Sequence, residues 1–167
     1  MLKGLDPLLN AELLCALAAM GHGDELAIVD RNFPAASLGR RIVRLEGADT
    51  ARASHAILSV LPVDTVIEFP LIRMEVADHP AEIPPVQASF LHIAEEAEQR
   101  SLAVQALPRH AFYERVRSAY VVVTTGELRP YACFLIVKGV ISSAEPRDGE
   151  NAGHLLDGAR SATGVGP

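Results

Sequence analysis

Short apolar runs alternate with longer helix-forming segments along most of the chain, and this alternation limits the fold more than any other feature. The runs that predict strands are 26–29, 42–45, 71–76, 103–107, 120–125 and 133–138. The segments that predict helices are 7–20, 50–60, 84–100 and 110–118. Helices that alternate with strands are typical of layered α/β folds.

The sequence also predicts local details of these elements. Asp6 is expected to cap the first helix, with Pro7 in its first turn, and Gly21 is expected to end it. Residues 71–76 alternate apolar and charged side chains, which predicts a half-buried strand. A short turn separates 120–125 from 133–138, so these two strands are expected to pair as an antiparallel hairpin within a mixed sheet.

Length and composition indicate one domain with a sizeable core. The chain has 167 residues, of which 49% are hydrophobic. Its character changes at about Ser142, because the segment 142–167 holds five of the twelve glycines and almost no apolar run. We therefore expect a working domain over 1–141 and a flexible C-terminal tail over 142–167.

Charge and hydropathy exclude several partners. The formal net charge is −6, and no cluster of basic residues is present, so nucleic acid is not an expected partner. No apolar run approaches 18 residues, so no membrane span is expected. A signal peptide is not recognisable, and Cys15 and Cys133 have neither disulfide nor metal-site spacing. These features predict a cytoplasmic protein with reduced thiols.

The segment MGHGDELAIVD, residues 20–30, contains the first candidate functional residues. His22 lies between two glycines at the end of the first helix, where it could act as a general acid/base or simply interact with the helix end. Asp30 closes the next strand, where ligands gather in open α/β sheets, although an ordinary Asx-turn is equally compatible. No second histidine follows at helical spacing, so no metal site is expected.

Two later segments contain the other candidates. Arg109 begins the helix of PRHAFYERVRSAY, where a cation gains nothing from the helix dipole, yet the segment also suits a solvated helix face. Tyr131 precedes the last strand and could bind a substrate hydroxyl or belong to the core. Cys133 in an apolar strand is more typical of an inert buried thiol than of a nucleophile. Nucleotide-binding and hydrolase motifs are not found.

The ordered set of segments resembles one family, the sugar mutarotases that include L-fucose mutarotase and D-ribose pyranase. The resemblance rests on LDPLL..ELL..LAAMGHGDE, VD..FPA.S.G, R.AFYERV and TGE..PYA...L..KGV, which together cover residues 1 to about 141. The GHGDE and AFYER forms are similar to the fucose branch. The resemblance implies a three-layer α/β/α fold with a mixed, mostly parallel sheet, assembled into a homo-oligomer, often a decameric ring.

The resemblance also implies roles for particular residues. His22 matches the proton donor of the family, and Asp30 and Arg109 match residues that contact the sugar. The pocket-lining segment falls on Tyr131, Ala132 and Cys133. Here the chain departs from the family, because Cys133 stands where asparagine is usual and a thiol cannot replace the hydrogen bonds of an amide.

These expectations together describe an isomerase that interconverts the anomers of L-fucose or a related sugar. Ring opening of a hemiacetal needs only general acid/base chemistry, so neither a cofactor nor a metal is expected. Two alternatives stay open at this point. One is a D-ribose pyranase, and the other is a non-catalytic sugar-binding module, which the cysteine at position 133 suggests.

Overall fold

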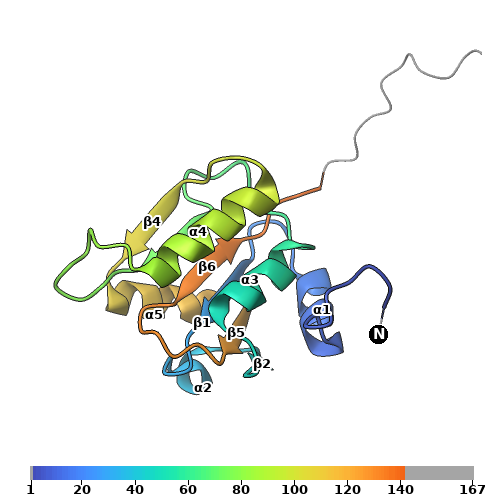
Figure 1. Cartoon of the computed structure of the whole chain (residues 1–167), viewed down its shortest axis with the longest axis horizontal. Coiled ribbons are helices and arrows are strands. Elements are labelled where there is room, and N and C mark those ends of the chain that lie inside the picture. Colours follow the sequence, from blue (N-terminus) through green and yellow to red (C-terminus); the bar gives the residue numbers. More distant parts are fainter. Residues whose placement is uncertain (1, 142–167) are drawn as a thin grey trace, which may run out of the picture.

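The computed structural model describes residues 2–141, and its middle layer is a six-stranded sheet (Figure 1). The strands are β1 (Glu25–Val29), β2 (Ile42–Leu45), β3 (Leu71–Met74), β4 (Val104–Leu107), β5 (Val121–Thr125) and β6 (Phe134–Val137). Their order is β2-β5-β1-β6-β3-β4. All adjacent pairs are parallel except those of β6, which runs antiparallel to β1 and to β3. The predicted mixed, mostly parallel sheet is confirmed.

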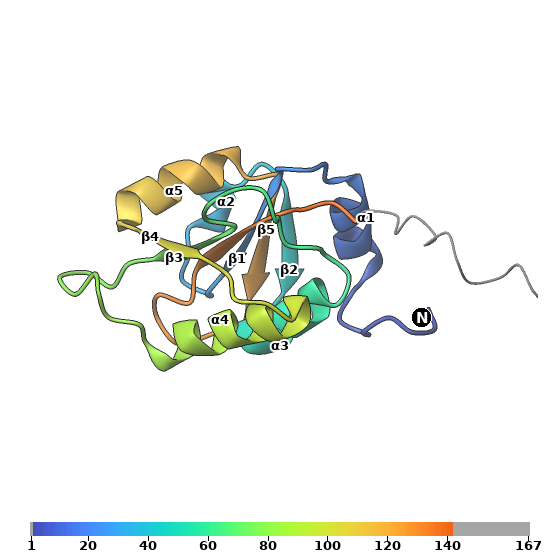
Figure 2. The same ribbon diagram turned by 90° about the horizontal axis from the view of Figure 1, so that it is seen from above.

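Helices cover both faces of the sheet, as the three-layer prediction requires (Figure 2). One face is packed against α1 (Ala11–Ala19), α3 (Thr50–Leu58) and α4 (Pro85–Glu98). The other is packed against α2 (Ala35–Leu38) and α5 (Arg109–Ser118). On the first face the rings of Phe90 and Phe134 stack with their centroids 3.9 Å apart. Two apolar clusters, one on each face, therefore form the core.

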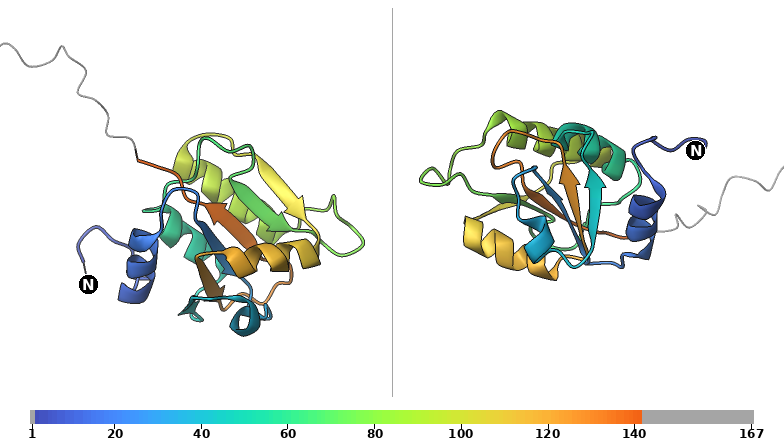
Figure 3. Two further views of the ribbon diagram at one scale, coloured as in Figure 1. Left: turned by 180° about the vertical axis from the view of Figure 1, so that it is seen from behind. Right: turned by 90° about the horizontal axis from the view of Figure 1, so that it is seen from below.

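The predicted hairpin between the last two strands is wrong. Strand β1 lies between β5 and β6, so the connection 126–133 crosses the end of β1 instead of closing a tight turn. Figure 3 shows β6 inserted between β1 and β3. This place buries every residue of β6, and an entirely apolar strand gains most free energy there. The short connection 126–133 therefore restricts how far β6 can lie from β5, but it does not determine which strands β6 pairs with.

The first helix is shorter than predicted. It begins at Ala11, because the Asn10 side chain accepts a hydrogen bond from Leu13 N–H. Asp6 instead accepts from Leu8 N–H in a preceding turn. The helix ends at Ala19 without a left-handed residue, so Gly21 does not have the expected role.

Strand β3 is buried at all four positions, not half-buried as its alternation predicts. Arg73 accounts for the difference, because this residue is only 5% exposed and its guanidinium donates to the buried Gln87 side chain and to the Pro80 and Glu82 carbonyls. The alternation of charge therefore reflects an internal polar contact rather than a solvated face. The flexible tail predicted over 142–167 lies outside the described residues.

Candidate active site

Five strands run in the same direction, so the sheet has an edge where these strands end and an edge where they begin. We call the first the carboxyl edge and the second the amino edge. Because β6 runs the opposite way, it starts at the carboxyl edge and ends at the amino edge. Segments before and after β6 therefore lie at opposite ends of the sheet from each other.

Asp30 lies at the carboxyl edge, directly after β1, and is 5% exposed. Its Oδ1 accepts from Asn32 N–H at 2.9 Å, which is the Asx-turn that the sequence allowed. Its Oδ2 accepts from Cys133 Sγ at 3.4 Å. Each carboxylate oxygen has two lone pairs, so one acceptor site per oxygen stays available for a ligand hydroxyl.

Residues 131–133 reach the same edge because they lead into β6. Ala132 and Cys133 are buried, whereas Tyr131 is half-buried and has a φ of 63°, in the left-handed region. Cys133 O accepts from Met74 N–H at 3.1 Å, so the segment is joined to the end of β3 as well as to Asp30.

The Cys133 thiol is inert in this position. Burial raises its pKa well above the usual value, and the nearby charge of Asp30 raises it further. The thiol therefore stays protonated and acts as a weak donor to Asp30. An asparagine amide at this place would offer two N–H groups and an oxygen, whereas the thiol offers one weak donor.

Helix α5 adds two further side chains at the carboxyl edge. Arg109 is exposed at its start, and Tyr113 lies one turn later and is half-buried against the edge of the Phe33 ring, 5.2 Å between centroids. Burial raises the pKa of Tyr113; Arg109 opposes this shift, and Cys133 and Asp30 add to it. Three of the residues predicted from the sequence are thus close enough to affect the charge of Tyr113, which the sequence analysis did not single out. The i,i+4 spacing from Arg109 to Tyr113 was the available signal.

An open cavity of about 390 Å³ lies beside Arg109. Its lining includes Glu75 and Asp78, which follow β3, and Pro108 and His110, which flank Arg109. This volume falls within the range of about 300–1,000 Å³ that is typical of small-molecule sites. Of the candidate residues, Arg109 lines this cavity, whereas Asp30, Tyr113 and the 131–133 segment lie outside its lining.

His22 lies at the amino edge, in the loop between α1 and β1. Gly23, with a φ of 83°, allows the loop to turn, and its N–H donates to Lys138 O at 2.9 Å. The His22 ring is 49% exposed, and its Nε2 lies 2.5 Å from Oδ2 of the buried Asp64. Asp64 is not among the residues predicted from the sequence, because no local pattern around it indicates a role.

Asp64 is ionised and determines which nitrogen of His22 carries a proton. Burial acts to raise the Asp64 pKa, but hydrogen bonds from the N–H groups of Ile67 and Val66 and from His22 outweigh it and lower the pKa. A carboxylate can only accept, so Nε2 of His22 must be the donor. In the neutral ring Nδ1 then holds the free lone pair.

Side chains from distant elements hold the loops that carry this pair. Lys138 Nζ donates to the Leu17 and Met20 carbonyls at 2.9 and 2.6 Å, at the C-terminus of α1. Arg100 Nη2 donates to the Asp64 carbonyl at 2.9 Å. The positions of the imidazole and the carboxylate are therefore set by the packing of α1, α4 and β6.

His22 and Asp30 lie at opposite ends of β1 and do not meet within one chain. The five residues of β1 separate them, a span of about 16 Å at about 3.3 Å per residue. Within one chain the imidazole therefore does not face Asp30. The structure brings together Asp30, Arg109, Tyr113 and the 131–133 segment, and it leaves His22 with Asp64.

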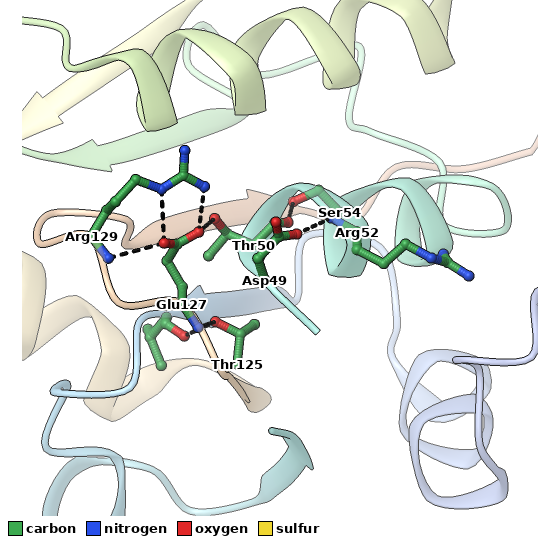
Figure 4. Close-up of polar contacts among 8 residues, drawn as sticks. Asp49, Thr50, Arg52, Ser54, Thr125, Glu127 and Arg129 are labelled. Carbon is green, nitrogen blue, oxygen red and sulfur yellow. Dashed lines mark hydrogen bonds and ion pairs between the residues drawn. The ribbon is translucent and has the colours of Figure 1, made fainter. Parts of the chain in front are cut away.

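A second polar network holds the loop after β5 (Figure 4). The buried Glu127 carboxylate accepts from Arg129 Nε and Nη2 at 2.8 and 2.6 Å and from Thr50 Oγ1 at 3.1 Å. Glu127 O also accepts from Arg31 N–H at 3.1 Å, next to Asp30. The network therefore joins the start of α3 to the loops at the carboxyl edge.

Glu127→Gln is expected to lower stability at neutral pH and to change its dependence on pH. The Arg129 hydrogen bonds lower the Glu127 pKa from 4.5 to about 2, against the effect of burial. The carboxylate therefore stabilises the fold above about pH 4.5 and loses this contribution as the pH falls through about 2. Urea unfolding should show that the free energy of unfolding of the wild type falls, between pH 7 and pH 2, by roughly 2–3 kcal/mol more than that of the variant.

Glu46→Gln is the matched control, because the Glu46–Arg44 pair is 3.5 Å apart and both side chains are more than 60% exposed. An exposed pair contributes about 0–1 kcal/mol, so this variant should follow the wild-type curve. A Glu127→Gln curve that also runs parallel to the wild type would contradict the assignment.

Within residues 2–141, no group of three or more His, Cys, Asp or Glu side chains is placed to hold a metal ion. In the same range, none of the helices is both long and apolar enough to cross a membrane.

Comparison with known proteins identifies the class to which this arrangement belongs. The model of the RbsD / FucU transport protein family matches residues 3–141. The chain therefore belongs to the RbsD/FucU family.

Individual relatives are similar over nearly their whole length. The L-fucose mutarotase of Actinobacillus pleuropneumoniae serotype 5b is 38% identical over 140 residues, which cover 84% of this chain and 97% of the relative. The crystal structure of protein Atu2016 has a TM-score of 0.81 and 47% identity, covering 85% of this chain and 97% of that one. The fucose mutarotase from Streptococcus pneumoniae in complex with L-fucose has a TM-score of 0.79 and 31% identity, covering 84% and 100%.

Proposed function

We propose that this protein is a cofactor-independent mutarotase that interconverts the α and β anomers of L-fucose or a closely related monosaccharide. The observation that carries the proposal is the ionised Asp64 that holds Nε2 of His22 as a donor and leaves Nδ1 to exchange a proton. Relatives named L-fucose mutarotase support the sugar class.

The reaction needs two proton transfers. One group protonates the ring oxygen while another removes the proton of the anomeric hydroxyl, so that the bond between the anomeric carbon and the ring oxygen breaks. Rotation of the open aldehyde and reversal of the same transfers give the other anomer. His22 is the proposed acid/base, and each such step is worth about 10²–10⁴-fold in rate.

The carboxyl-edge residues are the proposed sugar-binding groups. Asp30 accepts from a sugar hydroxyl, Arg109 donates to others, and Tyr131 donates or relays a proton. Tyr113 joins this set because it lies among Asp30, Arg109 and Cys133. Ala132 and Cys133 contribute to sugar binding through their backbone and their shape, because the Cys133 thiol already donates its hydrogen bond to Asp30.

His22 and these sugar-binding groups can serve one sugar only if two copies of the chain meet. We therefore propose a homo-oligomer, of which a decameric ring is one form, in which the amino edge of one copy faces the carboxyl edge of the next. Val66 and Val140, near Asp64 and the end of β6, are 76% and 55% exposed. Exposed apolar side chains around a polar pair are typical of a contact surface.

The test is an NMR saturation-transfer assay of exchange between anomeric protons, run across L-fucose, D-ribose and other monosaccharides. Acceleration of L-fucose exchange over the uncatalysed rate supports the proposal. Acceleration for D-ribose alone would identify a pyranase instead. Sugar binding by calorimetry with exchange at the background rate would identify a non-catalytic module. The observation that favours this alternative is the thiol of Cys133, a weak donor at a position where the family usually has an asparagine.

A further inference from the structure

A buried glutamine joins the sugar-binding segment to the centre of the fold. Gln87 lies on α4 and its side chain is 0% exposed. Its Nε2 donates to Tyr131 O at 2.9 Å and to Met74 O at 2.8 Å. One amide thus connects Tyr131, the first residue of the 131–133 segment, to the end of β3.

Arg73 determines the orientation of this amide. Its Nη1 donates to Gln87 Oε1 at 3.1 Å, and its guanidinium has no lone pair with which to accept. The amide oxygen must therefore face Arg73, which directs both amide hydrogens towards the Tyr131 and Met74 carbonyls. Arg73 is itself held by the Pro80 and Glu82 carbonyls at 2.9 and 3.2 Å.

Tyr131, whose carbonyl accepts from Gln87, has an uncommon backbone conformation. Tyr131 has a φ of 63°, and residues other than glycine persist there only where their surroundings determine it. The hydrogen bond from Gln87 fixes the Tyr131 carbonyl, and the buried Ala132 and Cys133 fix the chain that follows. The direction of the Tyr131 side chain depends on both.

We propose that Gln87 is a positioning residue for Tyr131, and that Arg73 orients the Gln87 amide for this purpose. The inference rests on the proposed function in one respect, that Tyr131 acts on the bound sugar. A purely structural glutamine would affect stability alone. A positioning residue also affects exchange, and it does so only through Tyr131.

The first test is a double-mutant cycle on the rate of L-fucose exchange. Gln87→Met should lower the rate about tenfold or more, because small misplacements of a positioning group are costly. In a Tyr131→Ala background the same substitution should change the rate less than twofold, because Gln87 then has no Tyr131 side chain to position. Equal losses in both backgrounds, or no loss in the wild type, would overturn the proposal.

Two further variants guard against effects of folding. Gln87→Glu keeps an oxygen for Arg73 but faces Tyr131 O with an acceptor, so it should reproduce the loss. Gln105→Met is the matched control, because Gln105 is a half-buried glutamine on β4 that accepts from Arg115 instead. It should leave the rate unchanged.

The second test needs no activity and separates this inference from the proposed function. The chain has three tyrosines and no tryptophan, so tyrosine ring signals in a ¹³C-labelled sample are few enough to assign individually. Gln87→Met should shift the Tyr131 signals and leave those of Tyr120 in place. If the wild type accelerates no sugar, the proposed function fails, but a shifted Tyr131 would still support positioning. An unmoved Tyr131 overturns it.

Discussion

His22→Ala is expected to reduce anomer exchange of the substrate sugar to the uncatalysed rate. The imidazole is the proposed acid/base, and its contact with Asp64 keeps Nδ1 available to give and take a proton. A positioned acid/base contributes about 10²–10⁴-fold, which is the expected loss. Saturation transfer between the anomeric protons measures it directly.

Asp64→Asn should give an intermediate loss under the same assay. An asparagine keeps the size of the side chain but removes the charge that determines the donor nitrogen of His22. His92→Ala is the control, because His92 is an exposed histidine on α4 that is not part of the His22–Asp64 pair. Exchange at the wild-type rate in His22→Ala would remove His22 from the mechanism.

Co-expression of two inactive variants is expected to restore activity if each site combines two copies. His22→Ala removes the group at the amino edge, and Asp30→Asn removes one at the carboxyl edge. In a random mixture a site is complete when one copy supplies an intact His22 and its neighbour an intact Asp30, which is about a quarter of sites in a closed symmetric ring. Exchange in the purified mixed oligomer should therefore reach about a quarter of the wild-type rate per site.

The matched control mixes two variants with lesions at the same edge. His22→Ala and Asp64→Ala each damage the pair at the amino edge, and these two residues act within one chain. No mixture of them contains a complete site, so exchange should not rise above the mean of the rates of the two variants measured separately. An inactive mixture of His22→Ala with Asp30→Asn, formed from variants that do assemble together, would show that sites are not shared between copies.

The elements and the fold class could be predicted because they depend on local patterns. Each apolar run from 26–29 to 133–138 coincides with a strand to within two residues, and the layered α/β fold follows from the alternation of these strands with helices. Helix ends are less predictable. At the start of α1, Asn10 and not Asp6 accepts from a free backbone N–H, and at its end Lys138 donates to a backbone carbonyl where Gly21 was expected to end the helix. Where two possible capping residues lie a few positions apart, the packing around them decides which one caps the helix.

Strand order was not available from the same patterns. The pairing of β6 with β1 and β3 depends on which neighbours bury both of its faces, and the short connection from β5 is compatible with several places. Arg73 looked like a solvent-facing residue because charge normally marks exposure. Its acceptors come from the 80–87 region, which no local pattern around Arg73 reveals.

For the candidate site, residue chemistry and tertiary geometry made separate contributions. The residues themselves, together with their resemblance to sugar mutarotases, were enough to nominate His22, Asp30, Arg109 and the 131–133 segment. Only the folded chain decided that His22 and Asp30 lie at opposite ends of β1, and that Asp64, 42 positions away, is the partner of His22. The reason is physical: a side chain's type is a local property, whereas its neighbours are decided by the direction of strands and the packing of elements distant in the chain.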